Sequence, residues 1–469
     1  MKKLEYKNER LEEFNRYLRN RKVAVIGLGV SNLPLLDYLK KQEAIVTVFD
    51  KRTADILPKE VLNKVSNNGM NSSLGENYLD NLVGFDIIFR SPSCRPDIPQ
   101  IEAEIERGTI LTSEIEMLMN TCPGTVIGVT GSDGKTTTTT LIYEILKQKG
   151  LNCYLGGNIG TPLFTKVEEM TPEDYVILEL SSFQLMTMQV SPKIAVVTNV
   201  SPNHLDIHKS YEEYIEAKKN IFKYQQENNI VVLNYDNEIT KEFAKEAPGK
   251  VRFFSRKTRL EDGVILDDGI IKLCEDRLRK HMLNTKDVKL RGVHNYENIC
   301  AAIAATLGLV EEKEMVKAIT SFAGVEHRLE FVREIDGAKW YNDSIASSPT
   351  RTIAGLNSFD ENIVLIAGGY DKHLDYTPIA KPIIEHVGTL ILMGQTAGKI
   401  FDAVKEELEK TKKTLNIHMC ENMEDAVRLA KKYAKAGDVV MLSPASASFD
   451  LFKNFAERGE KFKELVNNM

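Results

Sequence analysis

Residues 126–138 have the spacing that points most directly to a reaction. They read Val-Ile-Gly-Val-Thr-Gly-Ser-Asp-Gly-Lys-Thr-Thr-Thr, an apolar run followed by a glycine-rich turn and then a helical pattern. Such a turn presents backbone N–H groups and a helix N-terminus to a polyphosphate. Lys135 can reach the outer phosphates, and the Thr136 hydroxyl can bind Mg²⁺. The segment predicts that the chain uses a nucleoside triphosphate.

This spacing departs from the common phosphate-binding loop, which has a glycine five residues before its Gly-Lys pair. Val129 holds that position here, and the glycines are Gly128, Gly131 and Gly134. The alternative interpretation is a surface loop rich in glycine and threonine. The residues predicted to surround ATP phosphates are Gly131, Ser132, Asp133, Gly134, Lys135, Thr136, Thr137 and Thr138.

Two downstream strand ends carry polar residues that suit the same site. Glu179 ends the apolar run 175–180 and could share Mg²⁺ with Thr136, although a carboxylate there could also cap a helix. His204 follows the apolar run 194–199. Ligands of parallel sheets bind beyond the carboxyl ends of the strands, so we expect both residues at one edge.

Two helical patterns place polar residues where they could contact ligands. Lys218 falls on the apolar face of pattern 210–222, where a lysine is costly unless it is paired or chemically modified. A lysine that reaches solvent along the helix surface is the alternative. Asn295 and Asn298 lie three apart in pattern 293–305 and suit an adenine edge, although Asn295 could instead cap the helix.

The elements that must position these residues alternate between apolar runs and helical patterns along the whole chain. Uninterrupted Val/Ile/Leu runs indicate parallel strands covered on both faces. We therefore predict an α/β protein of three domains. They are a Rossmann-like domain at 1–112, a central domain at 113–324 with a parallel sheet like that of P-loop ATPases, and a second Rossmann-like domain at 325–469.

The first domain begins with a strand–helix–strand unit. Its turn contains Gly27 and Gly29, its third fingerprint position is Asn32, and Asp50 ends the second strand. The third position normally holds glycine, so the motif alone does not decide between NAD and a sugar nucleotide. Ser91 follows a further apolar run and could also face a diphosphate.

Composition limits the classes of partner. The 469 residues carry a formal net charge of −6, so no basic field points to nucleic acid or to anionic membranes. No apolar run is long enough for a membrane span, and the first residues lack the apolar core of a signal peptide. The six cysteines lie far apart, which is typical of reduced thiols. We expect a cytoplasmic protein with small-molecule substrates, no nucleic acid and no membrane insertion.

The order of the motifs resembles that of the Mur ligases, over essentially the entire chain. The shared motifs include the phosphate-binding loop, residues 178–185 and 198–204, Ala217-Lys218, His294–Asn298 and Glu326-His-Arg328. Residues 342–344, 368–372 and 442–448 are closest to the branch that adds D-glutamate. The chain lacks the Asp-Asn-Pro-Arg box of the diaminopimelate- or lysine-adding branch and the His-Gly-Lys loop of the alanine-adding branch.

The resemblance implies an ATP-dependent ligase of peptidoglycan precursor synthesis. ATP would phosphorylate the carboxylate of UDP-N-acetylmuramoyl-L-alanine, and the amine of D-glutamate would attack the resulting acyl phosphate. ATP and two Mg²⁺ ions are implied, and we expect a monomer. The alternatives are a related ligase that adds L-glutamate or another amino acid, and a folylpolyglutamate-type ligase. The latter would not explain a complete first domain.

The resemblance also implies roles for individual residues. Catalysis would use Lys135, Glu179, His204 and Lys218. The two metal ions would be bound by Thr136, Glu179, His204 and carbamylated Lys218. ATP would also contact Asn295, Asn298, Arg328 and Asp343. The UDP substrate would contact Gly29, Val30, Ser31, Asp50, Lys51, Arg52, Ser91, Asn158, Ser181 and His204. The amino acid would contact Ser347, Lys372, Ser448, Phe449 and Phe455.

Two positions depart from the family pattern. Ser93 stands where a glycine is usual, which affects the backbone approach to the diphosphate. Ile345 stands where a lysine is common. Two rival classes fit less of the chain: a nicotinamide dehydrogenase ignores the phosphate-binding loop, and a non-catalytic nucleotide switch leaves Glu179, His204 and Lys218 without a purpose.

Overall fold

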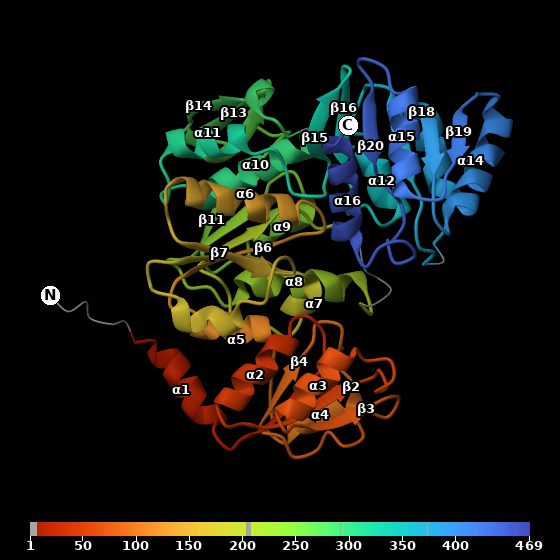
Figure 1. Cartoon of the computed structure of the whole chain (residues 1–469). Coiled ribbons are helices and arrows are strands. Elements are labelled where there is room, and N and C mark those ends of the chain that lie inside the picture. Colours follow the sequence, from red (N-terminus) through yellow and green to blue (C-terminus); the bar gives the residue numbers. More distant parts are fainter. Residues whose placement is uncertain (1–6, 203–207, 291, 373) are drawn as a thin grey trace. The chain divides into compact units, whose positions relative to one another are not determined.

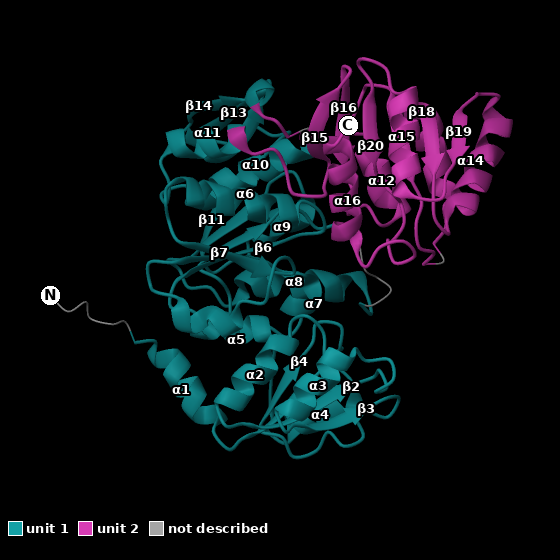
Figure 2. Cartoon of the chain, in the orientation of Figure 1, with its two compact units in different colours: residues 1–287, 294–320 teal, residues 288–293, 321–469 magenta. Residues whose placement is uncertain are grey.

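The computed structural model describes residues 7–202, 208–290, 292–372 and 374–469 (Figure 1). Its strands form three sheets with helices between them, which confirms the predicted α/β class. The chain divides into two compact units, shown in Figure 2. Unit 1 comprises residues 1–287 and 294–320 and contains two sheets; unit 2 comprises residues 288–293 and 321–469 and contains one. The three predicted domain boundaries remain predictions.

The first sheet of unit 1 is parallel, in the order β3-β2-β1-β4-β5. Its central strand β1 is buried from its second residue onward because Val, Ala and Ile side chains face helices on both sides. The carboxyl ends of β1, β2 and β4 therefore share one edge. The elements are α1 (Glu9–Leu18), β1 (Lys22–Ile26), α2 (Leu33–Lys41), β2 (Ile45–Asp50), α3 (Lys59–Asn67), β3 (Asn71–Leu74), β4 (Ile87–Arg90), α4 (Pro99–Glu106) and β5 (Ile110–Thr112).

The second sheet of unit 1 has the order β14-β13-β12-β11-β10-β9-β6-β8-β7. Strand β6 lies between β8 and β9, so the phosphate-binding loop after β6 is flanked by the ends of both. The elements are α5 (Glu114–Thr121), β6 (Thr125–Thr130), α6 (Lys135–Gln148), β7 (Cys153–Gly157), η1 (Phe164–Glu169), β8 (Tyr175–Glu179), α7 (Ser182–Leu185), β9 (Ile194–Val197), α8 (Tyr211–Lys223), β10 (Ile230–Asn234), α9 (Glu238–Phe243), β11 (Lys250–Ser255), β12 (Gly263–Asp267), β13 (Ile270–Glu275), β14 (Leu278–Asn284), η2 (Thr285–Asp287), α10 (Val293–Thr306) and α11 (Glu312–Ser321).

One end of this sheet is antiparallel, which differs from the predicted all-parallel arrangement. Two-residue turns connect β12 to β13 and β13 to β14. All four turn residues have positive φ: 49° at Asp268, 72° at Gly269, 48° at Asp276 and 68° at Arg277. Two consecutive residues of positive φ match the twist of a tight hairpin, and Asp-Gly is a strong sequence signal for one. The pair Asp268-Gly269 therefore indicates the hairpin between β12 and β13.

The two sheets of unit 1 share a hydrophobic core. Phe14 of α1, Tyr38 of α2 and Phe164 of η1 belong to one cluster that also contains side chains of β1, β6 and β8. The ring centroids of Tyr38 and Phe164 are 4.8 Å apart, and those of Phe14 and Phe164 are 6.1 Å apart, both in edge-to-face geometry. Edge-to-face pairs add to the stabilisation from burial. This core fixes the first sheet against the second.

Unit 2 contains a sheet of order β15-β16-β20-β17-β18-β19, with only β15 antiparallel to its neighbour. In β17, Ile363 and Leu365 pack against α13 and α14, while Val364 and Ile366 pack against α15 and α16. The elements are β15 (Glu330–Ile335), β16 (Ala338–Asn342), α12 (Pro349–Leu356), β17 (Ile363–Ala367), η3 (Thr377–Ile379), α13 (Ala380–His386), β18 (Val387–Leu392), α14 (Ala397–Thr411), β19 (Asn416–Met419), α15 (Met423–Tyr433), β20 (Val439–Leu442) and α16 (Phe455–Asn467).

Candidate active site

The phosphate-binding loop between β6 and α6 needs glycine at two positions. Gly131 has φ 152°, and a Cβ there would collide with the Thr198 hydroxyl. Gly134 has φ 79°, and a Cβ there would collide with the Asn298 amide oxygen. Both φ values lie in a region that other residues rarely adopt. The loop is therefore held close to the residue that follows β9 and to helix α10.

A hydroxyl and a carboxylate meet at the start of α6. The Thr136 hydroxyl donates to Glu179 Oε2 over 2.7 Å, and Asn158 Nδ2 donates to Glu179 Oε1 over 2.8 Å. Glu179 is only 2% exposed, at the end of β8. The Asn158 amide fixes the carboxylate so that its other oxygen faces the loop. The structure thus brings together two of the predicted metal-binding residues.

Two lysines donate hydrogen bonds to the loop, and both reach the Gly131 carbonyl. Lys135 Nζ donates to the carbonyl oxygens of Gly131 and Ser132 over 3.0 and 2.9 Å. Lys218 Nζ, on α8, donates to the Gly131 carbonyl over 2.9 Å and to the Thr130 hydroxyl over 3.3 Å. Lys218 is 1% exposed, so the inward direction predicted for it is confirmed. Burial, and then repulsion by Lys135, lower the pKa of Lys218 well below its usual value.

The other residues of the loop have structural partners. The Ser132 hydroxyl lies 2.9 Å from the Tyr214 hydroxyl of α8, and the backbone N–H of Asp133 donates to the Asn199 side chain over 2.9 Å. Thr137 and Thr138 are buried in the first turns of α6. The loop conformation is therefore tied to β9 and α8 on one side and to α6 on the other.

The two asparagines of α10 lie in its first turns. The helix begins at Val293, so Asn295 is inside the helix, and its amide oxygen accepts a hydrogen bond from Asn298 Nδ2 over 3.1 Å. Both side chains are buried. The Asn298 amide oxygen occupies the place that a Cβ on Gly134 would need, so Asn298 lies next to the phosphate-binding loop.

The ends of β1 and β2 form the polar edge of the first sheet. Asp50 Oδ2 accepts the backbone N–H of Leu28 over 2.8 Å, and Asp50 Oδ1 accepts both the backbone N–H and Nε of Arg52 over 2.9 Å. Burial raises the pKa of Asp50, but the hydrogen bonds from Arg52 and Leu28 outweigh it and the net pKa is lowered. Asn32 Nδ2 donates to the carbonyls of Ile26 and Gly27, so this side chain stabilises the turn.

The other predicted UDP-binding residues of the first sheet surround that edge. Gly29 and Lys51 are exposed, Ser31 is half-buried, and Val30 is 77% exposed. The Ser91 hydroxyl lies 3.1 Å from the Ser93 hydroxyl, at the end of β4. The structure therefore gathers the predicted residues of the first sheet at one edge.

Arg90 connects this edge to the second sheet. Its Nη2 donates to the Phe183 carbonyl over 2.9 Å and to the Thr187 hydroxyl over 3.1 Å. Burial lowers the pKa of Arg90. Ser181, two residues before Phe183, accepts the Gln184 N–H and begins helix α7. Sequence reasoning missed Arg90, although an arginine directly after the apolar run of β4 was a signal for it.

His204 lies outside the described residues. Four residues further along the chain, His208 Nε2 lies 2.9 Å from the Ser182 hydroxyl. His208 is 3% exposed and its ring stacks on Phe183, with the two centroids 5.1 Å apart. The chain that follows the predicted histidine is thus fixed beside α7.

In unit 2, Asp343 directly follows β16 and is buried. Its Oδ1 accepts the backbone N–H of Leu329 over 3.2 Å, and its Oδ2 accepts the Ser443 hydroxyl over 2.7 Å. Burial raises the pKa of Asp343 to about 7, although Ser443, Leu329 and the cations Arg328 and Arg351 act in the opposite direction. The predicted pair Arg328 and Asp343 is therefore together in this unit.

Four of the predicted amino-acid-binding residues belong to the loops after β16, β17 and β20, and the fifth, Phe455, is the first residue of α16. Lys372 Nζ lies 5.6 Å from the centre of the Phe449 ring, and Ser448 is 2% exposed beside it in sequence. Phe449 and Phe455 are 59% and 41% exposed. Ser347 is half-buried and donates its N–H to the Ile345 carbonyl over 2.8 Å. These positions share one edge of the sheet, because β20 pairs with both β16 and β17.

Arg458 of α16 holds two of these loops, and sequence reasoning missed it. Its Nε and Nη2 donate to the hydroxyl and carbonyl of Ser344 over 3.0 and 2.8 Å. Its Nη1 donates to the carbonyls of Ser446 and Ala447 over 3.1 and 2.9 Å. Burial lowers the pKa of Arg458 to about 10. The available signal was its four-residue spacing from Phe462, which places an arginine on the core face of the helix.

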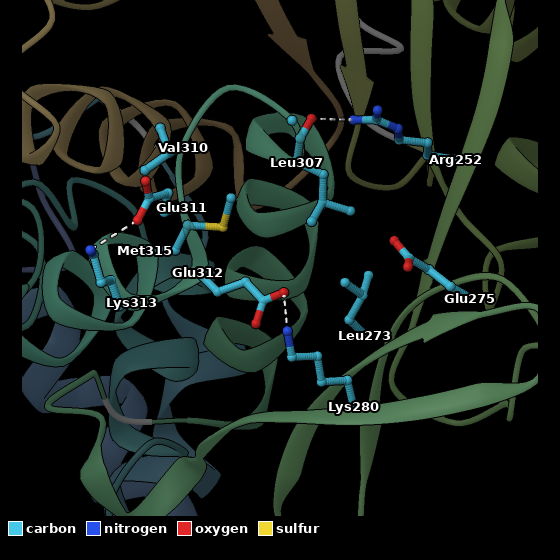
Figure 3. Close-up of a pocket in the computed structure, with 11 residues that line it drawn as sticks. Arg252, Leu273, Glu275, Lys280, Leu307, Val310, Glu311, Glu312, Lys313 and Met315 are labelled. Carbon is cyan, nitrogen blue, oxygen red and sulfur yellow. Dashed lines mark hydrogen bonds and ion pairs between the residues drawn. The ribbon is translucent and has the colours of Figure 1, made fainter.

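A hollow elsewhere in unit 1 contains none of the predicted site residues. It lies between α11 and strands β11, β13 and β14 (Figure 3). Arg252 Nη1 donates to the Leu307 carbonyl over 3.1 Å, and Lys280 pairs with Glu312 over 2.8 Å. Both signs of charge are present, and Glu311 pairs with Lys313 over 3.0 Å. The predicted site residues of unit 1 lie at the strand ends instead.

The chain matches three family models in order. Residues 21–113 match the N-terminal domain described as Mur ligase, MurD-like; residues 129–306 match the Mur ligase middle domain; and residues 327–446 match the Mur ligase glutamate ligase domain. Within the described part of the chain, every helix is too short or too polar to cross a membrane.

Curated relatives match over nearly the full length. A UDP-N-acetylmuramoylalanine--D-glutamate ligase of Acetivibrio thermocellus is 53% identical over 98% of this chain and 99% of its own length. An enzyme of the same name from Clostridium acetobutylicum is 50% identical over 97% of this chain and 98% of its own length.

Solved structures share the fold at low identity. The UDP-N-acetylmuramate-alanine ligase MurC of Thermotoga maritima aligns with a TM-score of 0.57 at 16% identity, covering 96% of this chain and all of its own. The MurF ligase of the same organism, solved in complex with ADP, aligns with a TM-score of 0.54 at 19% identity, covering 97% of each chain.

Proposed function

This chain belongs to the Mur ligase family, and we propose that it joins D-glutamate to UDP-N-acetylmuramoyl-L-alanine with consumption of ATP. The names of the relatives at 50% and 53% identity support the choice of substrates. One observation supports the reaction type: the Thr136 hydroxyl and the Glu179 carboxylate meet 2.7 Å apart at the phosphate-binding loop. In this reaction an acyl phosphate forms on the muramoyl-alanine carboxylate, and the amine displaces phosphate.

The donors at the loop fit magnesium. Mg²⁺ prefers hard oxygen ligands and keeps several waters, so a hydroxyl and one carboxylate are a suitable protein contribution. The Asn158 amide holds the carboxylate in place. When bound, the ion neutralises charge on the transferring phosphoryl group. We assign Thr136 and Glu179 to one ion, and His204 and Lys218 to a second.

The two lysines have different roles in this proposal. Lys135 leaves the loop carbonyls when ATP arrives and binds the outer phosphates. Lys218 has a lowered pKa, so more of its amine is neutral at physiological pH. A neutral amine attacks CO₂ and releases a proton, which gives a carbamate. The carbamate replaces a buried cation by an anionic oxygen ligand for metal.

The two sheets of unit 1 divide the recognition of the UDP substrate. We assign Asp50, Arg52 and Ser91 to the UDP part because they share the edge of the first sheet, together with Gly29, Val30, Ser31 and Lys51. Asn158, Ser181 and His204 are assigned to the muramoyl-alanine part. Asn158 already contacts Glu179, so this assignment puts the reacting carboxylate near the phosphate-binding loop.

The loops of unit 2 supply the amino-acid site in this proposal. Lys372 carries the charge that a side-chain carboxylate requires, and Ser347 and Ser448 offer short hydrogen-bond donors. Phe449 and Phe455 are exposed in this structure and would cover the aliphatic part of the ligand. Arg328 and Asp343 are assigned to ATP, with Asn295 and Asn298. We also propose that the protein acts as a cytoplasmic monomer, which gel filtration tests.

Phosphate release tests the function. We expect the purified protein to release phosphate from ATP only when UDP-N-acetylmuramoyl-L-alanine and D-glutamate are both present. L-Glutamate, L-lysine and D-alanine should give no release above background. L-Glutamate has the opposite configuration at Cα, which turns its side-chain carboxylate away from Lys372, and L-lysine and D-alanine have no side-chain carboxylate for Lys372 to bind. Thr136→Ala serves as the inactive control. Equal turnover with a neutral amino acid would contradict the proposal.

A further inference from the structure

Arg90 is a buried cation at the end of β4, and its side chain is 1% exposed. Its hydrogen-bond partners in the described part of the chain are four backbone carbonyls and one hydroxyl, all of them uncharged. Within the same residues, its Nε has no hydrogen-bond partner. Burying a charge in such surroundings is costly, and an apolar side chain would avoid that cost. Arg90 therefore needs a role beyond filling the space.

One side of the guanidinium holds the loop after β4. Nη1 donates to the carbonyl oxygens of Ser91, Pro92 and Cys94 over 3.3, 3.3 and 2.6 Å. This loop lies against the turn after β1, because a Cβ added to Gly27 would be 2.6 Å from Ser91 Oγ. Arg90 therefore fixes the segment that carries Ser91 at the edge assigned to UDP.

The other side of the guanidinium holds helix α7. Nη2 donates to the Phe183 carbonyl over 2.9 Å and to the Thr187 hydroxyl over 3.1 Å. The cap of this helix is Ser181, two residues after Glu179 at the end of β8. Ser181 is assigned to the muramoyl-alanine part of the substrate, and Glu179 to magnesium. One buried side chain thus joins the two segments assigned to opposite ends of the same substrate.

UDP-N-acetylmuramoyl-L-alanine must meet both segments at once, because its two ends are covalently connected. When the nucleotide end is bound at the first sheet, the separation of the segments decides where the carboxylate lies. A displacement of about 1 Å at a reacting group can cost roughly a hundredfold in rate. A guanidinium suits this task because it is planar and has donors on two sides, whereas a lysine has one nitrogen on a flexible stem.

We propose that Arg90 is a positioning residue for the UDP substrate, which sets the separation between the loop of Ser91 and helix α7 and so places the substrate carboxylate at the phosphate-binding loop. This inference rests on the proposed function. Arg90 acts through the two segments that it holds. UDP alone contacts only the first sheet in this scheme, so its binding depends on the separation far less than that of the full substrate.

The test compares the dissociation constants of UDP and of UDP-N-acetylmuramoyl-L-alanine by titration calorimetry. Thr187→Val removes one acceptor on the α7 side at nearly constant volume and leaves the contacts of Nη1 in place. We expect it to weaken binding of the full substrate about threefold to tenfold, the size of one hydrogen bond, and to leave that of UDP within about twofold. Arg90→Met has no donors, and it should weaken the full substrate about tenfold or more and by a larger factor than UDP.

The KM for ATP should stay within about twofold in both variants, because Arg90 has no contact with the phosphate-binding loop among the described residues. Arg90→Lys keeps the charge but cannot reach both segments at once, so its affinity for the full substrate should be intermediate. Arg21→Gln is the matched control and should behave as the wild type. Arg21 is an exposed arginine that pairs with Asp86 at the opposite edge of the first sheet, where β1 and β4 begin.

A residue that only stabilises the fold does not distinguish the two ligands. Equal weakening of UDP and of the full substrate, or no weakening of the full substrate by Thr187→Val, would therefore overturn this inference. Thr187→Val alone decides the matter if Arg90→Met does not fold. A wild type that releases no phosphate with ATP, UDP-N-acetylmuramoyl-L-alanine and D-glutamate would overturn the proposed function itself.

Discussion

Lys218 is a buried amine that has a backbone carbonyl and a hydroxyl as its hydrogen-bond partners. A charged ammonium in this position loses its hydration and is repelled by Lys135, which explains the lowered pKa. Retaining a lysine here is costly unless its nitrogen does chemistry. Carbamylation removes the conflict, because it converts the cation into an anion that a metal ion can bind.

We predict that Lys218→Ala lowers kcat by about a hundredfold or more, the loss typical of one electrostatic stabiliser at a reaction centre. Binding of an ATP analogue should change little, since Lys135 and the loop backbone are intact. Lys218→Arg should be no better than the alanine variant, because arginine cannot form the carbamate. Phosphate release and nucleotide titration measure the two effects. Carbon-dioxide-free buffer should reduce the wild-type rate and bicarbonate should restore it; an active arginine variant would contradict the carbamate.

Lys218 and Glu179 were predictable from the sequence, because a charged residue in a buried position has few structural roles. A lysine on an apolar helix face and a carboxylate after a buried strand both conflict with burial unless they bind something, as Lys218 and Glu179 illustrate. Arg90 and Arg458 were not predicted. Their partners include backbone carbonyls that are distant in sequence, that of Phe183 for Arg90 and that of Ser344 for Arg458. A sequence does not show which distant carbonyls the fold brings to a buried arginine.

At the scale of elements, helix α5 begins with a buried acid. Ser113 caps the helix by accepting the N–H of Glu116 over 3.2 Å. Glu114, the first helical residue, accepts the backbone N–H of Phe164 over 2.8 Å, which joins α5 to η1. Burial raises the pKa of Glu114 to about 7, although the hydrogen bonds from Phe164 and Leu163 act in the opposite direction.

Glu114 should make stability depend on pH. In the unfolded chain this carboxyl has an ordinary pKa of 4.5, and in the fold it is about 7. Between these values the folded protein binds more protons, so the free energy of unfolding should fall as pH rises from about 5 to about 7.5. The loss is at most roughly 3 kcal/mol, from the size of the shift. Glu114→Gln keeps the acceptor for Phe164 and cannot ionise.

The measurement is the difference in Tm between the wild type and Glu114→Gln across that pH range. We expect the variant to become relatively more stable with rising pH. Glu168→Gln is the control, because Glu168 forms an exposed ion pair with Lys41. A constant difference in Tm between wild type and Glu114→Gln would show that the carboxyl ionises normally in the fold.

The strands and helices were predicted more completely than their pairing directions. Unbroken apolar runs such as β6, β8 and β17 identify buried strands, because few other structures bury every side chain in a row. Strands β12, β13 and β14 bury only two or three residues each, and their direction follows from two-residue turns at Asp268 and Asp276. The turn residues therefore indicate the antiparallel direction of these strands, which the pattern of apolar residues alone does not.

At the scale of the whole molecule, the predicted substrate sites are divided between the two compact units. The phosphate-binding loop and the proposed UDP site belong to unit 1, and the proposed amino-acid site belongs to unit 2. A sequence predicts the three sheets from local patterns. No single segment of the chain encodes how the two units are arranged during the reaction.

Amide-bond formation needs the attacking amine and the acyl phosphate within roughly 3–3.5 Å of each other. We therefore predict that the two units adopt a more compact arrangement when their ligands are bound, as in other enzymes that close around substrates. Small-angle X-ray scattering should show a smaller radius of gyration with an ATP analogue and UDP-N-acetylmuramoyl-L-alanine together than with either alone. Lys135→Ala should show no such change, because it loses the cation that holds the outer phosphates. An unchanged radius in the wild type with both ligands bound would mean that the units meet without a measurable closure.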